Sequence, residues 1–229
     1  MTVRMGTARL GPAERSAALA EMAARELDVV VVGGGVVGAG VALDAVTRGL
    51  TVGLVEARDF ASGTSSRSSK LIHGGLRYLE QYNFDLVREA LQERSLLLQR
   101  IAPHLVRPVP FLYPLTHRVW ERFYAGAGVA LYDVLARVSG RRAGLPIHRH
   151  LTRRGARRLV PALRKDALVG ALKYYDAQVD DARHTLFVAR TAASYGAHVA
   201  SRARVIGLLR DVVAEYGVDK TAQMSIVDL

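Results

Sequence analysis

The chain has 229 residues; half of them are hydrophobic and 23% are charged, which is typical of a globular protein and too apolar for a disordered one. It contains no cysteine, which excludes disulfides, thiolate metal sites and cysteine nucleophiles. The formal net charge is +11, but ten basic residues and no acidic ones fall between Arg137 and Lys165. The rest of the chain is close to neutral, which argues against a protein that coats nucleic acid uniformly.

The first part of the chain predicts a β-α-β unit behind a helical extension. Residues 1–26 are expected to form the extension, and no apolar run there is typical of a secretory signal. The valine-rich residues 27–32 predict a buried strand, followed by a glycine cluster and a helix over residues 36–48 that ends at Gly49. A second strand is expected over residues 50–55. Parallel strands joined by a helix have this order and length.

Beyond this unit the pattern is less regular. Residues 57–82 are expected to be loop and turn, and a helix is expected to begin after Asn83 as its N-cap. Four of the seven prolines lie in residues 103–114 and indicate the start of a second substructure. Later segments predict a helix over 120–136, a helix capped by Asp180 or Asp181 that ends at Gly196, and a strand over 197–208.

The glycine cluster contains the G-x-G-x-x-G pattern of a dinucleotide-binding turn. Gly33 is expected to permit the tight turn, Gly35 to let a pyrophosphate approach the backbone, and Gly38 to let the helix pack closely. The helix N-terminus would supply N–H groups and a positive dipole. Glu56, at the end of the second strand, would accept hydrogen bonds from a ribose diol. Its carboxylate would repel a 2′-phosphate, which disfavours NADP as the cofactor. The alternative is a glycine-rich turn that binds nothing.

The segment after the second strand favours FAD over NAD, since both cofactors use such a half-fold. Its short hydroxyls and one amine suit a diphosphate and a polar ring edge; they are Thr64, Ser65, Ser66, Ser68, Ser69 and Lys70. A solvated serine-rich linker is the alternative. The tail of the segment is not typical of a linker, because it is apolar and contains His73, paired glycines, Arg77 and Tyr78.

In three motifs, the chain is similar to the FAD-dependent glycerol-3-phosphate dehydrogenases of the respiratory kind, which pass electrons to quinone. The motifs are the GGGxxGAG turn, the segment Thr64–Glu80 and the segment Tyr174–Arg183. The N-terminal helix and the middle rich in arginine and proline are similar to the actinobacterial version. The resemblance covers residues 10–210 and is expected to fade after Arg210.

This resemblance implies an α/β fold of the two-domain flavoprotein oxidoreductase type, with a Rossmann-like FAD-binding domain and an incomplete substrate or cap region. Residues 1–26 would be the helical extension, 27–102 the FAD-binding part, 103–175 a basic cap that faces a membrane, and 176–229 a truncated return to the FAD-binding domain. Family members are more than twice as long. The chain is therefore expected to be an N-terminal fragment that cannot turn over substrate unaided.

The resemblance also assigns residues to the cofactor and the substrate, and it implies no metal. The positions matched to FAD binding are Gly33, Gly35, Gly38, Glu56, Thr64, Ser65, Ser66, Ser69, Lys70, His73 and Val205. The positions matched to the substrate pocket and its chemistry are His73, Arg77 and Tyr78. The implied reaction oxidises sn-glycerol 3-phosphate to dihydroxyacetone phosphate, with a hydride passed to FAD and electrons passed on to quinone.

The chemistry of these side chains agrees with that reaction. Arg77 offers a fork of donors for a phosphate, although an ion pair with Glu80 is the alternative. Tyr78 could hydrogen-bond the substrate, and His73 is either a base or, preferably, a group that gives an orienting hydrogen bond. Asp180 and Asp181 are expected to be helix caps or partners of Arg183 rather than catalytic acids.

Other functions remain open at this point: an NAD-dependent or other FAD-dependent oxidoreductase, or an inactive dinucleotide-binding fragment. Nucleic-acid binding is disfavoured because aromatic residues are nearly absent from the basic stretch 137–165. The aromatic residues of 120–136 (Trp120, Phe123, Tyr124 and Tyr132), followed by that stretch, predict docking on an anionic membrane surface. This places the protein in the cytoplasm, peripheral on the inner face of the cell membrane. The alternative is a solvated helix face formed by Arg153, Arg154, Arg157 and Arg158, and a homodimer is left open.

Overall fold

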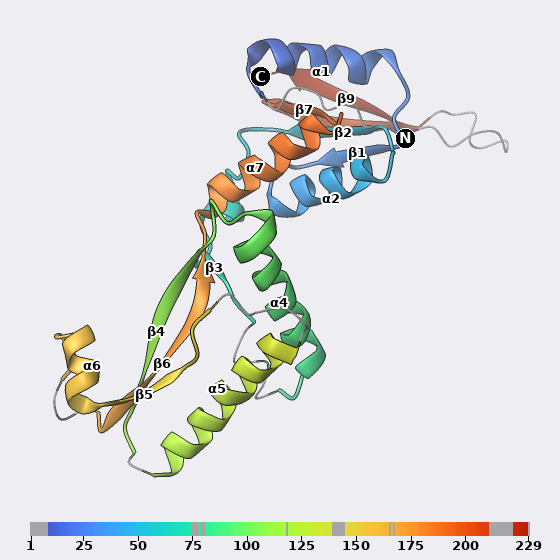
Figure 1. The fold of residues 1–229 in the computed structure, drawn as a ribbon. Helices are drawn as coiled ribbons and strands as arrows, with labels where there is room; N and C mark the ends of the chain where they lie inside the picture. The colour runs from blue at the N-terminus through green and yellow to red at the C-terminus, as the bar shows by residue number, and fades with distance from the viewer. Residues whose placement is uncertain are drawn as a thin grey trace. The chain divides into compact units, whose positions relative to one another are not determined.

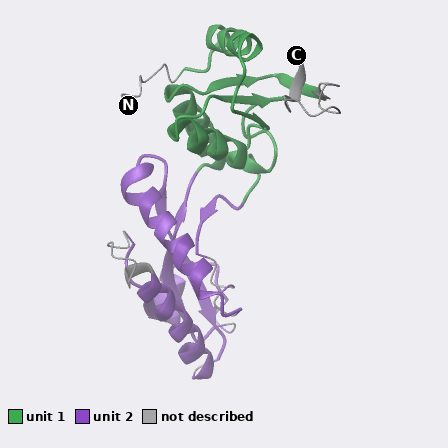
Figure 2. Ribbon diagram, turned by 90° about the vertical axis from the view of Figure 1, so that its right-hand side faces the viewer, with its two compact units in different colours: residues 1–68, 180–229 green, residues 69–179 purple. Residues whose placement is uncertain are grey.

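The computed structural model describes residues 9–74, 78, 81–117, 119–138, 145–164, 166, 168–210 and 222–228. The chain divides into two compact units, one made of residues 1–68 and 180–229 and the other of residues 69–179 (Figure 2). The first is called the nucleotide unit and the second the sheet unit. The resemblance divided the chain into four segments, with boundaries after residues 26, 102 and 175. The functions that it assigned to these segments stay predictions.

The nucleotide unit is built on three parallel strands in the order β1-β2-β7. β1 (Val29–Val32) and β2 (Val52–Glu56) are joined by α2 (Val36–Thr47), as predicted. After the excursion through the sheet unit, α7 (Asp181–Ser194) leads back to β7 (His198–Ser201), which pairs with β2. The predicted α/β fold with a parallel sheet is confirmed.

The two faces of this sheet are covered by different helices (Figure 1). On one face α2 and α7 pack against each other through buried small residues, including Ala42, Ala189 and Ala192, which let the helices approach closely. On the other face lies α1 (Pro12–Ala24), the expected helical extension, whose Leu19 and Met22 pack near Val55. β2 is consequently buried on both faces, which explains its apolar sequence.

The N-terminus of α7 and the C-termini of α2 and α7 follow the local rules expected from the sequence. Asp180 Oδ1 accepts a hydrogen bond from Arg183 N at 3.0 Å and caps α7, as predicted. Gly49 and Gly196, with φ of +90° and +106°, follow α2 and α7 in the left-handed conformation that favours glycine. The predicted strand over residues 197–208 is instead two strands, because Arg202 has a φ of +54° and breaks it before β8 (Ala203–Arg210).

The sheet unit is an antiparallel sheet whose central strand is β6 (Gly170–Gln178). β4 (Arg107–Leu115) pairs with β6 along its whole length, while β3 (Leu71–Ile72) and β5 (Arg149–Thr152) also pair with β6. The helices of this unit are α4 (Phe84–Leu96), with the π-helical turn η2 (Leu97–Ile101), α5 (Trp120–Val138) and α6 (Arg153–Leu159). Asn83 caps α4 through Oδ1, which accepts from Leu86 N at 3.3 Å, as predicted.

The proline-rich stretch is a strand, which its sequence did not predict. Pro108, Pro110 and Pro114 all lie in β4, at even-numbered positions of the chain. Successive residues of a strand point their N–H groups to opposite sides, so the missing N–H groups of these prolines all fall on one side. In the part of the chain that the structure describes, β4 pairs only with β6, and an edge strand tolerates proline on its free side.

Candidate dinucleotide-binding site

The glycine turn between β1 and α2 needs glycine at two places for different reasons. Gly33 has a φ of +110°, and its N–H donates to Val55 O at 2.8 Å, which ties the turn to the neighbouring strand β2. A Cβ on Gly38 would lie 2.0 Å from Gly33 O, a backbone atom that cannot move aside. The first turn of α2 therefore lies directly on the glycine turn, as the sequence predicted for Gly38.

Residues 64–70, called the serine segment, hold the N-terminus of α2. Gly35 is the N-cap of α2, and the next residue, Val36, donates its N–H to Ser65 Oγ at 2.9 Å. A Cβ on Gly35 would lie 3.1 Å from that same hydroxyl oxygen. The first N–H groups of a helix have no partner inside the helix, and they attract anions. The Ser65 oxygen therefore occupies one of the N–H groups at the helix N-terminus where an anion would bind.

Glu56 connects the glycine turn to the end of β2. Its Oε2 accepts from Gly34 N at 2.7 Å and its Oε1 accepts from Arg58 N at 2.8 Å. Each carboxylate oxygen has further lone pairs, so the group can still accept hydrogen bonds from a diol. The two backbone donors fix the orientation of the carboxylate before any ligand binds.

We expect Glu56→Gln to weaken both this connection and nucleotide binding. In either orientation the amide would turn an NH2 group toward a backbone N–H, which replaces a hydrogen bond to a charged group by a repulsive contact. The free energy of unfolding should fall by about 1.5 kcal/mol, and FAD affinity by about tenfold. Urea unfolding and FAD titration measure the two effects. Glu26→Gln, which removes the same charge from an exposed side chain, should change neither; equal effects of the two variants would contradict the prediction.

Gly34 is a residue of the turn that the sequence motif does not single out. A Cβ there would lie 2.6 Å from Phe60 Cδ1 and 2.9 Å from Glu56 Cβ. Its carbonyl oxygen accepts from Ala61 N at 3.0 Å, in addition to its N–H bond to Glu56. The loop after β2 is therefore closed onto the turn at Gly34. Gly34 is a variable position of the G-x-G-x-x-G pattern, and the longer GGGxxGAG motif, which contains it, does not indicate that it contacts the loop after β2.

The serine segment begins with a 3-10 turn, η1 (Thr64–Ser66), and is bonded to α7 through Ser68. Ser68 donates both its N–H and its O–H to Asp181 Oδ2, at 3.1 and 2.7 Å. Asp181 thus holds the serine segment, whereas the sequence suggested a helix cap or a partner of Arg183. Val205 on β8 packs with Val55, Ala200 and Ala203, and its approach to the adenine stays a prediction.

The remaining residues that the sequence assigned to the site belong to the sheet unit. Ser69 and His73 are exposed, and Tyr78 is exposed with its carbonyl oxygen accepting from Asn83 N at 3.0 Å. Arg77 and its alternative partner Glu80 lie outside the described residues. Among the residues that are described, no group of three histidines and carboxylates could hold a metal ion.

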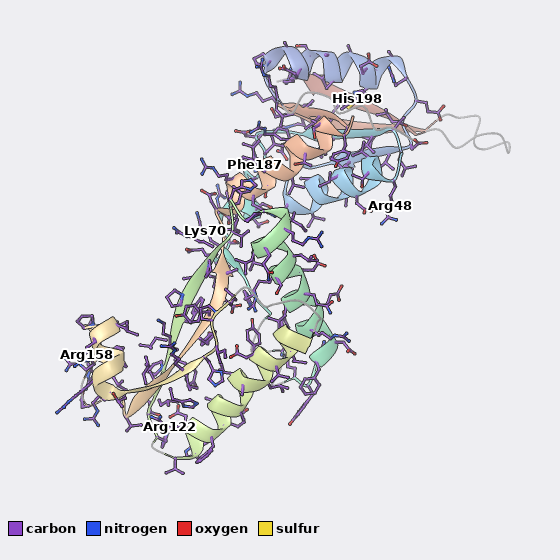
Figure 3. The ribbon with its side chains drawn as sticks, in the orientation of Figure 1. Arg48, Lys70, Arg122, Arg158, Phe187 and His198 are labelled. Atoms are coloured by element: carbon purple, nitrogen blue, oxygen red, sulfur yellow. The ribbon has the colours of Figure 1, made fainter. Side chains whose placement is uncertain are left out.

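Lys70, labelled in Figure 3, has a φ of +60°, a conformation that costs a residue with a side chain about 1–2 kcal/mol. Its carbonyl oxygen accepts from Val179 N at 2.9 Å, which holds the backbone there. We expect Lys70→Gly to be more stable than Lys70→Ala by about 1 kcal/mol, because only glycine relieves the strain. Both variants lose the amine, so both should lose FAD affinity equally. Urea unfolding and FAD titration check this, and an alanine variant as stable as the glycine variant would refute it.

The strand, the glycine turn, the helix and the carboxylate at the end of the second strand together define a dinucleotide-binding α/β protein. The chain belongs to the family of FAD dependent oxidoreductases, which it matches over residues 28–227. FAD, which the sequence favoured over NAD, is the cofactor of this family. The family match extends past Arg210 and includes most of β9 (Ala222–Asp228), which pairs with β8. The fading of the narrower resemblance to glycerol-3-phosphate dehydrogenases after Arg210 stays a prediction.

Among curated proteins, the chain is 61% identical over 204 residues to "Glycerol-3-phosphate dehydrogenase 2" of Mycobacterium tuberculosis, which covers 89% of this chain and 34% of that protein. It is 47% identical to the mitochondrial glycerol-3-phosphate dehydrogenase of Rattus norvegicus, over 86% of this chain and 27% of the relative. The glycerol-3-phosphate dehydrogenase of Bacillus halodurans, solved with FAD, superposes with a TM-score of 0.63 at 32% identity over 90% of this chain and 32% of that one. The predicted resemblance is confirmed. The chain spans about a third of the length of these relatives.

Proposed function

We propose that this chain binds FAD at the glycine turn and serves the oxidation of sn-glycerol 3-phosphate to dihydroxyacetone phosphate. The observation that carries the proposal is the assembled turn, in which Gly38 lies on Gly33 and Glu56 is bonded to Gly34. The identity of 61% to a mycobacterial glycerol-3-phosphate dehydrogenase supports the choice of substrate. Because the chain spans about a third of that relative, the activity of the whole enzyme is part of the proposal.

The residues of the nucleotide unit fit the cofactor. The pyrophosphate would lie at the N-terminus of α2, where Gly35 has no side chain and the Ser65 hydroxyl, which accepts from Val36 N, could donate its proton to a phosphate oxygen. Glu56 would accept hydrogen bonds from the ribose hydroxyls. The resemblance also assigns Ser69, Lys70 and His73 of the sheet unit to FAD binding. When bound, FAD supplies the acceptor for a hydride.

The substrate chemistry would fall to the segment that ends in Tyr78. Hydride leaves C2 of the substrate with its bonding electrons while the C2 hydroxyl gives its proton to a base. Arg77 would bind the phosphate dianion, and the Tyr78 hydroxyl would hydrogen-bond the substrate. The exposed imidazole of His73 would orient a reacting group or take the proton.

An absorbance spectrum of the purified chain, after incubation with FAD and desalting, tests cofactor binding. We expect flavin bands in the wild-type chain, and their absence would overturn the cofactor assignment. We expect no reduction of a dye by glycerol 3-phosphate, because the relatives that carry the activity are about three times as long. Dye reduction that depends on glycerol 3-phosphate would show that the chain alone is sufficient.

We further propose that the sheet unit docks on an anionic membrane at the inner face of the cell membrane, where electrons pass on to a quinone. Supporting this, three aromatic side chains of α5 lie exposed to solvent: Trp120 at 61%, Phe123 at 74% and Tyr124 at 63%. Trp and Tyr favour the boundary between lipid and water. None of the helices in the described part of the chain is long and apolar enough to cross a membrane.

Two of the four arginines of the basic helix α6 bond to the local backbone. Arg153 Nε donates to Leu168 O at 2.9 Å and Arg157 Nε donates to Leu163 O at 3.0 Å, so these two arginines hold the local backbone. Arg154 and Arg158 are exposed, and Arg158 is labelled in Figure 3. These two would provide the contact with anionic lipid.

Vesicle flotation tests the membrane proposal. We expect the chain to float with vesicles containing phosphatidylglycerol, and Arg154→Gln/Arg158→Gln or Phe123→Ser to reduce the floated fraction. Arg48→Gln, which removes an exposed charge from the nucleotide unit, is the control. Equal binding to neutral and anionic vesicles would remove the electrostatic part of the proposal. A homodimer stays a prediction that light scattering would check.

A further inference from the structure

A buried polar network in the sheet unit ends on the backbone of Gly74, the residue that follows His73. Gly74 N donates to Tyr132 Oη at 2.7 Å, and Tyr132 Oη donates to Asp176 Oδ1 at 2.9 Å. Arg94 Nη1 donates to Asp176 Oδ1 and, at 3.3 Å, to Tyr132 Oη. The three side chains come from α5, β6 and α4, so three separate elements meet at one point of the loop.

These three side chains are among the most buried polar groups described. Tyr132 is 1% exposed, Arg94 2% and Asp176 5%. Placing charges and a hydroxyl in such an environment is unfavourable unless each is paired. A buried network of this kind therefore needs a role that a simple apolar contact between the same elements would not fill.

The hydrogen bonds leave the Tyr132 hydroxyl only one orientation. A hydroxyl has one proton and two lone pairs. Both lone pairs are used by the N–H groups of Gly74 and Arg94, so the proton can only be donated to Asp176. Burial raises the pKa of Tyr132, so the hydroxyl keeps this proton. Burial also raises the pKa of Asp176, and the Arg94 guanidinium opposes this shift by favouring the carboxylate.

Packing also restricts the position of Gly74. A Cβ on it would lie 2.7 Å from Leu91 Cδ2 and 2.9 Å from Tyr132 Cε2. Leu91 and Tyr132 form a buried cluster with Val87. The backbone of Gly74 is thus pressed against α4 and α5, and its N–H is held by the hydroxyl of α5.

We propose that Tyr132 is a positioning residue, and that with Arg94 and Asp176 it anchors the backbone at Gly74 and so positions the neighbouring His73. Only His73 lies between the end of β3 and Gly74, so the anchor fixes the backbone beside it. Its relevance to the substrate rests on the function proposed above; the anchoring itself does not. Asp176 lies in the Tyr174–Arg183 motif and was assigned no role from the sequence, and this anchor would be that role.

The test compares Tyr132→Phe with Tyr124→Phe, which removes a hydroxyl from an exposed position of the same helix. Amide hydrogen exchange is measured by NMR on the whole chain. In Tyr132→Phe the ring packing is kept, and exchange of the Gly74 amide should rise about tenfold while the amides of Ala171 and Leu172 in β6 stay within about twofold. Tyr124→Phe should change none of them. Unchanged exchange at Gly74, or an equal rise at β6, would overturn the proposal.

A second measurement separates this inference from the proposed function. The shifts of the Gly74 and Tyr78 amides are followed while sn-glycerol 3-phosphate is added, with inorganic phosphate in a parallel titration. Tyr132→Phe should weaken any glycerol 3-phosphate binding at least fivefold, and binding equal to that of the wild-type chain would overturn the substrate-positioning part. If the wild-type chain shows no response, the proposed function loses its support, while the exchange at Gly74 still decides whether Tyr132 anchors the backbone there.

Discussion

Gly38→Ala is expected to abolish FAD binding and to lower the free energy of unfolding by about 3 kcal/mol. The added Cβ would lie 2.0 Å from Gly33 O and 3.3 Å from Val31 Cγ1, and the first of these atoms belongs to the backbone. Relief requires α2 to move away from the glycine turn, which would withdraw the helix N-terminus from the pyrophosphate. Circular dichroism during urea unfolding and an absorbance spectrum after incubation with FAD measure the two effects.

Gly40→Ala is the matched control for this prediction. Gly40 lies in α2 two residues further on, and a Cβ there would have no atom within 4 Å. Alanine in a helix interior is favoured over glycine, so this variant should gain about 0.5–1 kcal/mol and still bind FAD. If the two variants unfolded at the same urea concentration, close packing at Gly38 would not be the reason for the glycine.

Asp176→Ala is expected to be the most damaging single change in the sheet unit, with a loss of about 3–5 kcal/mol of unfolding free energy. It would leave the Arg94 guanidinium buried without its carboxylate, and it would remove the acceptor of the Tyr132 hydroxyl. Trp120, the one tryptophan of the chain, lies in α5, so its fluorescence during urea unfolding follows this unit.

Two further variants show whether the buried charge is the cause. Asp176→Leu combined with Arg94→Met removes both charges and should recover a large part of the lost stability. Asp44→Ala breaks the exposed pair between Arg48 and Asp44, and solvent screening should make its effect small. A double variant as unstable as Asp176→Ala would mean that the damage comes from lost packing rather than from an unpaired charge.

Local rules made the helix ends and the β-α-β unit predictable. Asn83 and Asp180 act as caps by accepting from backbone N–H groups three residues further on, and Gly49 and Gly196 adopt the conformation that glycine favours at a helix C-terminus. The sheet unit was less predictable, since its strands depend on pairing across long stretches of chain. Prolines concealed β4, because their spacing matters only once one edge of the strand is known to be free.

The same distinction applies to the candidate site. The glycine motif and the carboxylate at the end of the second strand predict Gly33, Gly35, Gly38 and Glu56 as positions that bind a nucleotide. Nothing in the motif indicated that Gly34 closes the following loop, that Asp181 holds Ser68, or that a tyrosine in a distant helix bonds to Gly74. Each of these is a contact between residues far apart in the sequence, and the chain pattern at either end is compatible with many partners.

The sequence alone determined the class of this protein, because a glycine turn, a helix N-terminus and a nearby carboxylate are constraints on a short stretch of backbone. The tertiary structure decided how the site is supported: the bond from Gly34 to Glu56, the Ser65 hydroxyl on α2, and the buried network on Gly74. It also showed that Arg153 and Arg157 of the basic stretch bond to the local backbone. These features depend on desolvation and close packing, which arise only where separate elements meet.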